Sequence, residues 1–187
     1  MNVSPAAPRF QTANTSSGIT ATIPSRKNWF VILFLGAWLG GWFFGEISAI
    51  STLTSEQSPE PFLMFWLVGW TLGALCAASI ILWQLFGQEI VAVDASSLVH
   101  RVEVLGIGRT RSFSLKQIEK LRSVDFSVGA VNNQASWMPP IFGHGVGTVA
   151  FDYGARTYRL APALDEAEAK LLVERLSKFM PMHSNTI

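Results

Sequence analysis

The sequence of 187 residues is poor in cysteine, in histidine and in charge. Its one cysteine, Cys76, excludes a disulfide framework. Charged residues make up 14% and balance to a net charge of +1, which excludes a strongly basic nucleic-acid-binding protein. The three histidines lie far apart, and none is at ligand spacing from another histidine or from the cysteine. We therefore predict no metal, no cofactor, no small-molecule substrate and no catalytic residue, and we expect that the protein is not an enzyme.

The shortage of charge is concentrated in one stretch, residues 28–87, which contains no lysine or arginine. Two apolar runs within it, residues 28–50 and 61–87, each reach the ~20 residues that cross the hydrocarbon of a bilayer. A polar, acidic segment with two prolines separates them, as expected of an exposed turn. Glu46 lies far along the first run, at a depth where it reaches the headgroup region. The pattern predicts a transmembrane helical hairpin over residues 28–87.

Lysine and arginine flank the hairpin on one side only. Arg26 and Lys27 precede the first run, Arg101, Arg109 and Arg111 follow the second, and the connecting turn has none. By the positive-inside rule we predict that both termini are cytoplasmic.

The residues before the hairpin differ in composition from those after it. Residues 1–27 are rich in serine, threonine, alanine and proline, and we predict a disordered tail there because little apolar surface is available to offset the entropy of ordering. Residues 88–183 are predicted to form a separate domain. Strand-like runs lie at residues 89–93, 98–105, 109–115, 120–127, 147–153 and 156–161.

Turn residues join the first three of these runs into a meander, and the chain ends in an amphipathic helix. Asp165 and Glu168 match a capping box, and Leu172, Leu176 and Phe179 recur at helical spacing. An antiparallel sheet of this kind must close on itself or be covered. The predicted fold is therefore a membrane α-helical hairpin plus an α+β domain, a PH-like antiparallel β-barrel or sandwich capped by a C-terminal helix.

Four stretches carry a resemblance to a known class of protein. They are SRKNWFVILFLG (25–36), WQLFGQE (83–89), GRTRSFSLKQIEKL (108–121) and GTVAFDYGARTYRL (147–160). Together they resemble small bacterial membrane proteins with two transmembrane helices and a PH-like domain. In length, hairpin and strand order the chain is also similar to the two-helix photosystem I assembly protein of chloroplasts and cyanobacteria. Both resemblances imply a membrane-tethered binding or assembly module, and the first implies that the chain lies in the bacterial inner (cytoplasmic) membrane.

Small and aromatic residues repeat at helical spacing within the two apolar runs. The candidate helix-packing glycines are Gly36, Gly40, Gly41, Gly45, Gly69 and Gly73. They fit either packing of the two helices on each other or packing on a partner's transmembrane helix. The tryptophan pairs Trp38/Trp42 and Trp66/Trp70 fit either contact with lipid, filling of the hairpin interface, or contact with a pigment or quinone.

Basic residues are dense soon after the second run. Arg101, Arg109, Arg111, Lys116, Lys120 and Arg122 are candidates for contact with anionic lipid. The alternative is an ion-paired sheet surface, because acidic residues interleave with them and Glu103 is expected to face Arg111 across a hairpin.

One long segment, residues 135–145, carries large apolar side chains where loops are normally polar. Trp137, Met138, Ile141 and Phe142 are candidates for contact with a partner or with the membrane, and the alternative is that they fold over their own domain.

These observations lead to one functional prediction and one alternative. We predict a non-enzymatic accessory or assembly factor that binds a larger integral membrane protein complex through its hairpin and its PH-like domain. The alternative is a membrane scaffold or sensor that acts alone, whose PH-like domain contacts anionic lipid of the bilayer.

Overall fold

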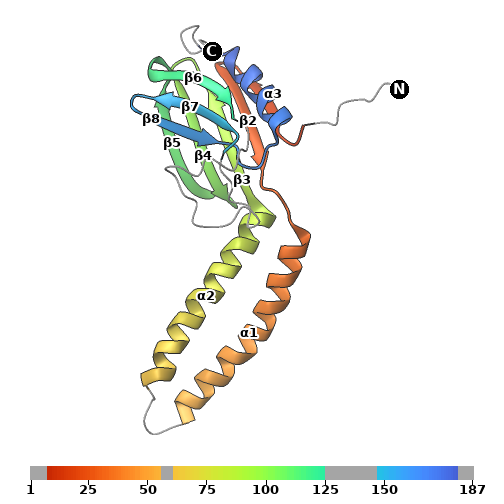
Figure 1. Cartoon of the computed structure of the whole chain (residues 1–187), viewed down its shortest axis with the longest axis vertical. Helices are drawn as coiled ribbons and strands as arrows, with labels where there is room; N and C mark the ends of the chain where they lie inside the picture. Colours follow the sequence, from red (N-terminus) through yellow and green to blue (C-terminus); the bar gives the residue numbers. More distant parts are fainter. Residues whose placement is uncertain (1–7, 56–60, 125–146, 181–187) are drawn as a thin grey trace, which may run out of the picture.

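The computed structural model describes residues 8–55, 61–124 and 147–180. A β-rich domain stands on one end of a long helical hairpin (Figure 1). Helix α1 spans Trp29–Ser55 and helix α2 spans Pro61–Phe86. Both are long and apolar enough to cross a membrane, and only 17% and 11% of the residues in their most apolar windows are buried within the chain. The prediction of two long apolar helices is confirmed.

Two antiparallel sheets make up the β-rich domain. The first has five strands in the order β1-β2-β3-β4-β5: β1 (Gln11–Thr15), β2 (Gly18–Pro24), β3 (Gly87–Val93), β4 (Ser97–Val104) and β5 (Ile107–Ser114). A 3-10 turn, η1 (Leu115–Gln117), leads to the second sheet, which contains β6 (Ile118–Ser123), β7 (Val149–Tyr153) and β8 (Arg156–Leu160). The predicted meander of β3, β4 and β5 is confirmed.

The prediction of a disordered tail is wrong for residues 11–24, which form β1 and β2. In β2, Ile19, Ala21 and Ile23 are buried and alternate with the more exposed Thr20 and Thr22. This period of two is the pattern of a strand with one face in a core. The composition of residues 1–27, which is rich in serine, threonine and proline, hides this short alternating pattern. Residues 11–15 and 18–24 of the predicted tail are therefore part of the first sheet.

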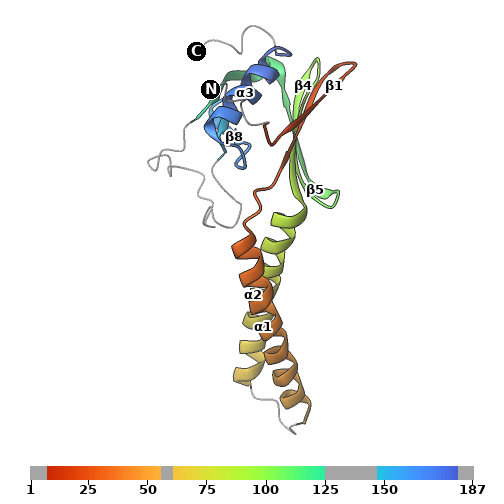
Figure 2. The ribbon, with the colours of Figure 1, turned by 90° about the vertical axis from the view of Figure 1, so that its right-hand side faces the viewer.

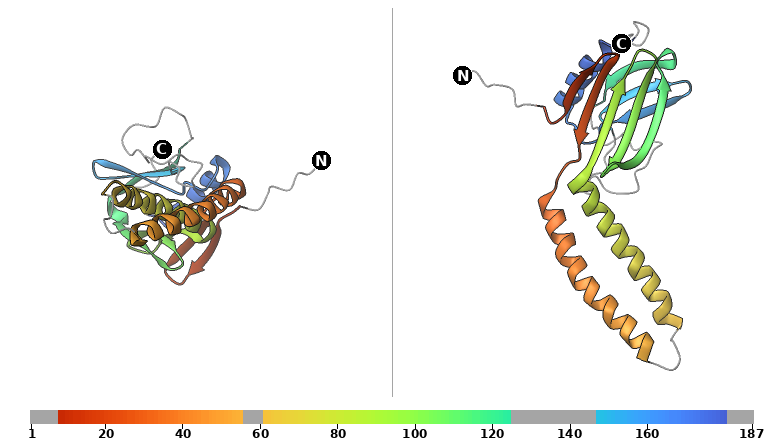
Figure 3. Two further views of the ribbon diagram at one scale, coloured as in Figure 1. Left: turned by 90° about the horizontal axis from the view of Figure 1, so that it is seen from below. Right: turned by 180° about the vertical axis from the view of Figure 1, so that it is seen from behind.

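The hairpin is an insertion between two neighbouring strands of the first sheet. Strand β2 enters α1 and strand β3 leaves α2, and the two strands pair from Ile19 with Val93 to Pro24 with Gln88. Figure 3 shows β2 and β3 side by side, each continuing into one helix. The predicted division into a hairpin and a separate domain of residues 88–183 is thus wrong in its N-terminal limit, because strands on both sides of the hairpin build one sheet.

The two sheets face each other around one hydrophobic core (Figure 2). Phe113 of β5 packs edge-on against Phe151 of β7 and Tyr158 of β8, with ring centroids 5.1 and 4.7 Å apart. Helix α3 (Glu166–Ser177) packs on β6 and β7, and Arg175 Nη1 donates to Thr12 Oγ1 of β1 at 2.7 Å. Among the described residues the sheets stay separate and no closed barrel forms. The coarser prediction, an α+β domain with a C-terminal helix, is confirmed.

Local signals in the sequence account for the start of α3. Asp165 accepts from the backbone N–H of Glu168, and the Glu168 side chain accepts from the backbone N–H of Asp165. The predicted capping box is therefore confirmed. Leu172 and Leu176 are fully buried, as their helical spacing predicted, whereas Phe179 is 40% exposed.

Candidate functional site

A network of hydrogen bonds connects the hairpin to the first sheet. Gln84, in the last turn of α2, is fully buried, and its Oε1 accepts from the backbone N–H of Asn28 at 2.9 Å. Its backbone carbonyl accepts from Ser25 Oγ at 3.0 Å, and Ser25 N–H donates to the carbonyl of Gly87 at 3.0 Å. Asn28 Oδ1 in turn accepts from Val31 N–H and caps the start of α1. Both helices are thus tied to the sheet and to each other.

Gly87 makes the direct passage from helix to strand possible. A Cβ at this position would lie 2.3 Å from the Trp83 carbonyl oxygen and 2.7 Å from its ring. Any side chain here therefore requires the end of α2 to move away from the start of β3. The second predicted apolar run ends at this residue, but local sequence does not predict the junction, since Gln84 and its partners are separated by more than 50 residues.

Trp–Gly contacts hold the two helices together farther from the domain. A Cβ at Gly73 would lie 3.1 Å from the Trp42 ring, and one at Gly45 would lie 3.3 Å from the Trp70 ring. Trp42 and Trp70 themselves pack with ring centroids 4.1 Å apart, and Trp70 Nε1 donates to the Trp42 carbonyl at 3.4 Å. These two glycines thus accommodate tryptophan rings from the opposite helix.

The remaining candidate glycines face away from the hairpin interface. A Cβ at Gly36, Gly40, Gly41 or Gly69 would meet nothing within 4 Å. The structure thus separates the six candidates into two that serve the hairpin itself and four that lie on its outer surface. The tryptophan pairs both extend the central contact, because Trp38 stacks edge-on against Trp42 and Trp66 packs on Trp70, with centroids 3.8 and 4.2 Å apart.

Glu46 is held within the hairpin by a polar contact. Thr71 Oγ1 of α2 donates to Glu46 Oε1 at 2.7 Å and also lies 2.9 Å from the Leu67 carbonyl. The carboxylate is therefore a cross-helix acceptor.

Two of the six basic candidates are engaged in ion pairs. Arg101 pairs with Glu103, and Arg122 pairs with Asp152 at 3.1 Å. The hydrogen bonds from Arg122 and from Thr157 Oγ1 hold the pKa of the Asp152 carboxyl below its ordinary value of 3.8. These pairs favour the predicted alternative of an ion-paired sheet surface for these two arginines.

The expected pairing of Glu103 with Arg111 is wrong. The turn between β4 and β5 is shorter than predicted, so Glu103 lies opposite Gly108 and Arg111 lies opposite His100. Glu103 accepts instead from Gln88 Nε2 on β3.

The basic candidates lie at different distances from the hairpin. Within the described residues, Arg109, Arg111 and Lys116 are exposed and make no ion pair, and exposed Lys120 contributes to the lowered pKa of Asp152. Lys116 borders a shallow depression with Lys178 and Ser96, beside the β3–β4 turn. That turn lies at the end of the sheet remote from the hairpin (Figure 2). Of the six candidates, only Arg101 and Arg109 lie in the halves of β4 and β5 that are nearer the hairpin.

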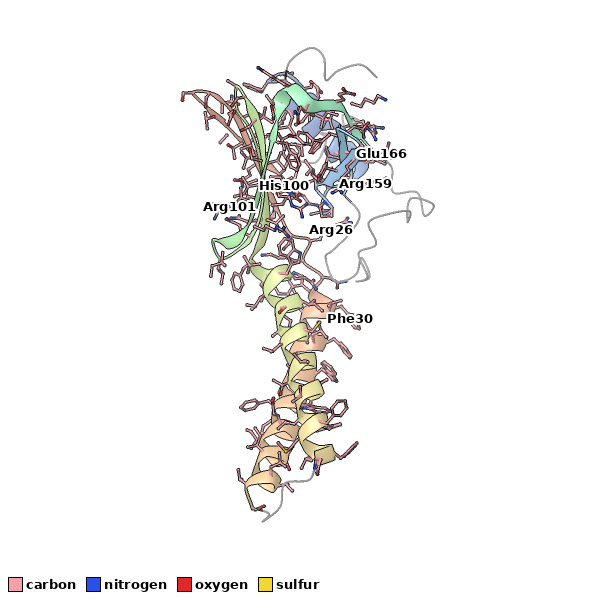
Figure 4. All side chains as sticks on the ribbon, turned by 90° about the vertical axis from the view of Figure 1, so that its left-hand side faces the viewer. Arg26, Phe30, His100, Arg101, Arg159 and Glu166 are labelled. Atoms are coloured by element: carbon pink, nitrogen blue, oxygen red, sulfur yellow. The ribbon has the colours of Figure 1, made fainter. Side chains whose placement is uncertain are left out.

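A buried polar cluster that the sequence analysis missed joins the two sheets. Glu89 of β3 is 5% exposed, and its two carboxylate oxygens accept from the backbone N–H of Ala161 at 3.0 and 3.1 Å. His100 Nε2 of β4 contacts the same carboxylate. Figure 4 shows His100 on the sheet face that looks toward the second sheet, with Arg101 on the opposite side.

Ala161 has a φ of 59°, in the left-handed region that disfavours alanine. Its carbonyl accepts from Thr148 Oγ1 at 2.8 Å, so hydrogen bonds on both sides hold this strained residue in place.

The candidate contact residues Trp137, Met138, Ile141 and Phe142 lie outside the described residues, and their predicted role stays a prediction. Among the residues that the structure describes, no group of three or more His, Cys, Asp or Glu side chains is arranged to hold a metal ion.

Comparison of this chain with protein-family models, with curated proteins and with solved structures finds no match. The resemblances drawn from the sequence therefore stay predictions, and functional inference rests on the geometry above.

Proposed function

We propose that this protein is a non-enzymatic, membrane-anchored accessory or assembly factor that binds a larger integral membrane protein complex. The observation that carries the proposal is the insertion of the apolar hairpin between β2 and β3. A flexible linker would let a domain and its anchor move independently. Here, buried Gln84 and two paired strands connect them, so the position of the helices sets the position of the sheet.

The outer surface of the hairpin suits contact with other membrane helices. Exposed glycines on α1, among them Gly36 and Gly40, leave the backbone accessible. Transmembrane helices associate through such small residues, because they allow close approach and dispersion contacts. A partner helix packed there would also orient the domain through the rigid junction. This arrangement supports a factor that recognises its complex with both parts at once.

The domain and its location belong to the same proposal. The two facing sheets followed by α3 support a PH-like domain, with the departure that its first two strands precede the anchor. Arg26 and Lys27, both exposed just before α1, support the cytoplasmic placement of the domain at a bacterial inner membrane. Figure 4 shows Arg26 between the domain and the hairpin.

Purification from native membranes in a mild detergent tests the proposal, with quantification of any protein retained in stoichiometric amount. Gly40→Leu adds a side chain where the hairpin itself has open space, so the melting temperature is expected to stay at the wild-type value while retention falls. Phe44→Leu, at an exposed position of α1 that already carries a large side chain and so fills no gap beside a glycine, is the control and should retain the partner. The proposal fails if wild-type protein retains no stoichiometric partner, or if both variants retain it equally.

The placement is tested separately, by labelling with a membrane-impermeant maleimide in a Cys76→Ala background. Ser51→Cys at the far end of α1 should label from outside intact cells, and Ser96→Cys in the β3–β4 turn should not. The opposite result contradicts the cytoplasmic placement but not the binding of a complex.

A further inference from the structure

Two large apolar side chains are exposed together on the β-rich domain. Leu105 is 67% exposed and Ile107 is 84% exposed, at the tip of the β4–β5 hairpin. Outside the two long helices, the only other large apolar side chain exposed among the described residues is Phe179, at 40%. Ile107 is more exposed than Phe65, which reaches 79% on the apolar surface of α2. Paired exposed apolar side chains at a loop tip are a sign of a contact surface.

The conformation of the tip makes leucine a costly choice there. Val104 pairs with Ile107, so Leu105 and Gly106 form the turn, with φ values of 52° and 82°. Two positive φ angles are typical of a type I′ turn, which favours asparagine or aspartate before glycine. A leucine Cβ is crowded in this region. The turn is held from the side, because Arg101 Nη2 donates to the Gly106 carbonyl at 2.9 Å. The stability of the turn does not explain a leucine at this position.

The tip lies at the level where α2 ends. Val104, the last residue of β4, pairs with Gly87, and Gly87 directly follows Phe86, the last residue of α2. In Figure 2 the β4–β5 turn is at the lower end of the sheet, next to the upper end of α2. If α2 crosses a bilayer, the tip is at the surface of the leaflet that contains the end of this helix.

The exposed charge around the tip is positive. Arg109 lies on the same face of β5 as Ile107, two residues further on, and is exposed. Arg101 lies on the opposite face of the sheet (Figure 4). The neighbouring acidic residue, Glu103, is only 6% exposed and is engaged by Arg101 and Gln88. Apolar side chains flanked by arginine match the chemistry of an anionic lipid surface.

We propose that the β4–β5 tip inserts Leu105 and Ile107 into the interfacial region of an anionic phospholipid bilayer, with Arg109 at the phosphate groups. This contact would be a third attachment point beside the two helices and would fix the tilt of the domain over the membrane. It rests on the part of the proposed function that makes α1 and α2 membrane-spanning, and it requires no partner protein.

Lipid-mediated quenching in nanodiscs tests the proposal on the full chain. A fluorophore is attached to one cysteine at a time: native Cys76 within α2, Ile107→Cys, or Ser96→Cys, the last two in a Cys76→Ala background. The nanodiscs contain phosphatidylcholine with or without phosphatidylglycerol, and spin-labelled lipids carry the quencher either near the headgroup or deep in the acyl chain. The probe at 107 should be quenched from the headgroup position, the probe at Cys76 from the deep position, and the probe at 96 from neither.

Two further variants separate a lipid contact from a structural effect. With the probe at 107, Leu105→Asn should lose most of the quenching while the melting temperature in detergent stays equal or rises, because asparagine suits the turn. Arg109→Gln should lose only the part of the quenching that depends on phosphatidylglycerol.

Quenching at Cys76 with no more quenching at 107 than at 96 overturns this inference and leaves the membrane anchor intact. Absence of deep quenching at Cys76 overturns the anchor and the inference together. If position 107 is shielded only in membranes that contain a retained protein partner, the tip docks on that protein, and the lipid contact proposed here is wrong.

Discussion

The β-rich domain and the helical hairpin are packed in opposite ways. The domain has a single core that joins both sheets and α3, with Phe151, Leu160 and Leu172 fully or almost fully buried. The buried cluster of the hairpin consists of Val31, Leu35, Ala77 and Ile80 near the domain, and beyond it the helices meet mainly through tryptophan and glycine. Most large side chains of the helices point outward.

This difference shows which contacts determine the structure of each region. A core that excludes water specifies the fold of the domain from within. The hairpin exposes more apolar surface than it buries, so its arrangement depends on an apolar surrounding and on a few shape-matched contacts. The side chains that stabilise the domain are therefore inside it, and the outward side chains of the hairpin are available for lipid or for other helices.

Truncating the same residue type in the two regions should give the largest contrast. Phe151→Ala removes a fully buried ring of the domain core and is expected to destabilise the protein by about 3–5 kcal/mol. Phe44→Ala removes a ring of α1 that is 74% exposed and should leave the melting temperature in detergent nearly unchanged. Thermal unfolding of both variants measures the contrast. Equal losses would show that the outer face of α1 is covered within the protein.

The second contrast lies within the hairpin. Gly73→Leu places a side chain against the Trp42 ring and should destabilise helix packing by about 1–3 kcal/mol through overpacking. Gly69→Leu, one turn earlier, meets open space and is the matched control. Tryptophan fluorescence and thermal unfolding in detergent follow both. A similar loss in the two variants would contradict the assignment of Gly73 to the interface and of Gly69 to the outer surface.

Two carboxylates give a third contrast. Glu89 is a buried acceptor that joins the two sheets, here called the clamp, and Glu46 accepts a hydrogen bond across the hairpin. Glu89→Gln removes one of two oxygens that hold the strained Ala161 and should cost about 1–3 kcal/mol. Glu46→Gln keeps an oxygen acceptor for Thr71 and should cost less. Denaturant unfolding compares the two. If the order is reversed, the hairpin contact is the stronger one, and the clamp between the sheets contributes little.

These contrasts also mark what the sequence could and could not predict. Signals carried by neighbouring residues are sufficient for some elements: the apolar runs predict α1 and α2, and Asp165 with Glu168 predicts the start of α3. Partners distant in the chain were not foreseen. Ile19 pairs with Val93 across the whole hairpin, and Glu89 binds an N–H that is 72 residues away. The alternation of Ile19, Ala21 and Ile23 was visible, but a strand needs a partner before the pattern can be interpreted.

In the candidate site, too, local spacing is predictable from the sequence, whereas contacts between distant segments are not. Spacing identified the glycines and tryptophans, but it did not separate Gly45 and Gly73 from the outward glycines, because that depends on how the helices are rotated. The exposed apolar tip at Leu105 and Ile107 is not predicted by the sequence, since its exposure and its level beside α2 depend on the strand register.

The smallest expected effect lies at the end of the domain remote from the hairpin, in the β3–β4 turn. Asp94 accepts from the backbone N–H groups of Ser96 and Ser97 at 2.8 and 2.7 Å, and also from both serine hydroxyls. These hydrogen bonds, led by the one from the Ser96 N–H, lower the pKa of Asp94 from 3.8 to about 2. Because the folded pKa is the lower one, the charged form stabilises the fold at pH values above 3.8, and this contribution is lost as the pH falls from 3.8 toward about 2.

Asp94→Asn should therefore be slightly less stable than the wild type near neutral pH, and the difference between the two melting temperatures should shrink as the pH falls through this window. Other carboxylates titrate in the same range, so only the difference between the two proteins is informative. The turn lies at the surface, where solvent screens the charge of Asp94, and this effect therefore ranks below the buried contacts. A difference that stays constant down to pH values of about 2 would mean that the shape of the turn, and not the charge of Asp94, carries the contribution.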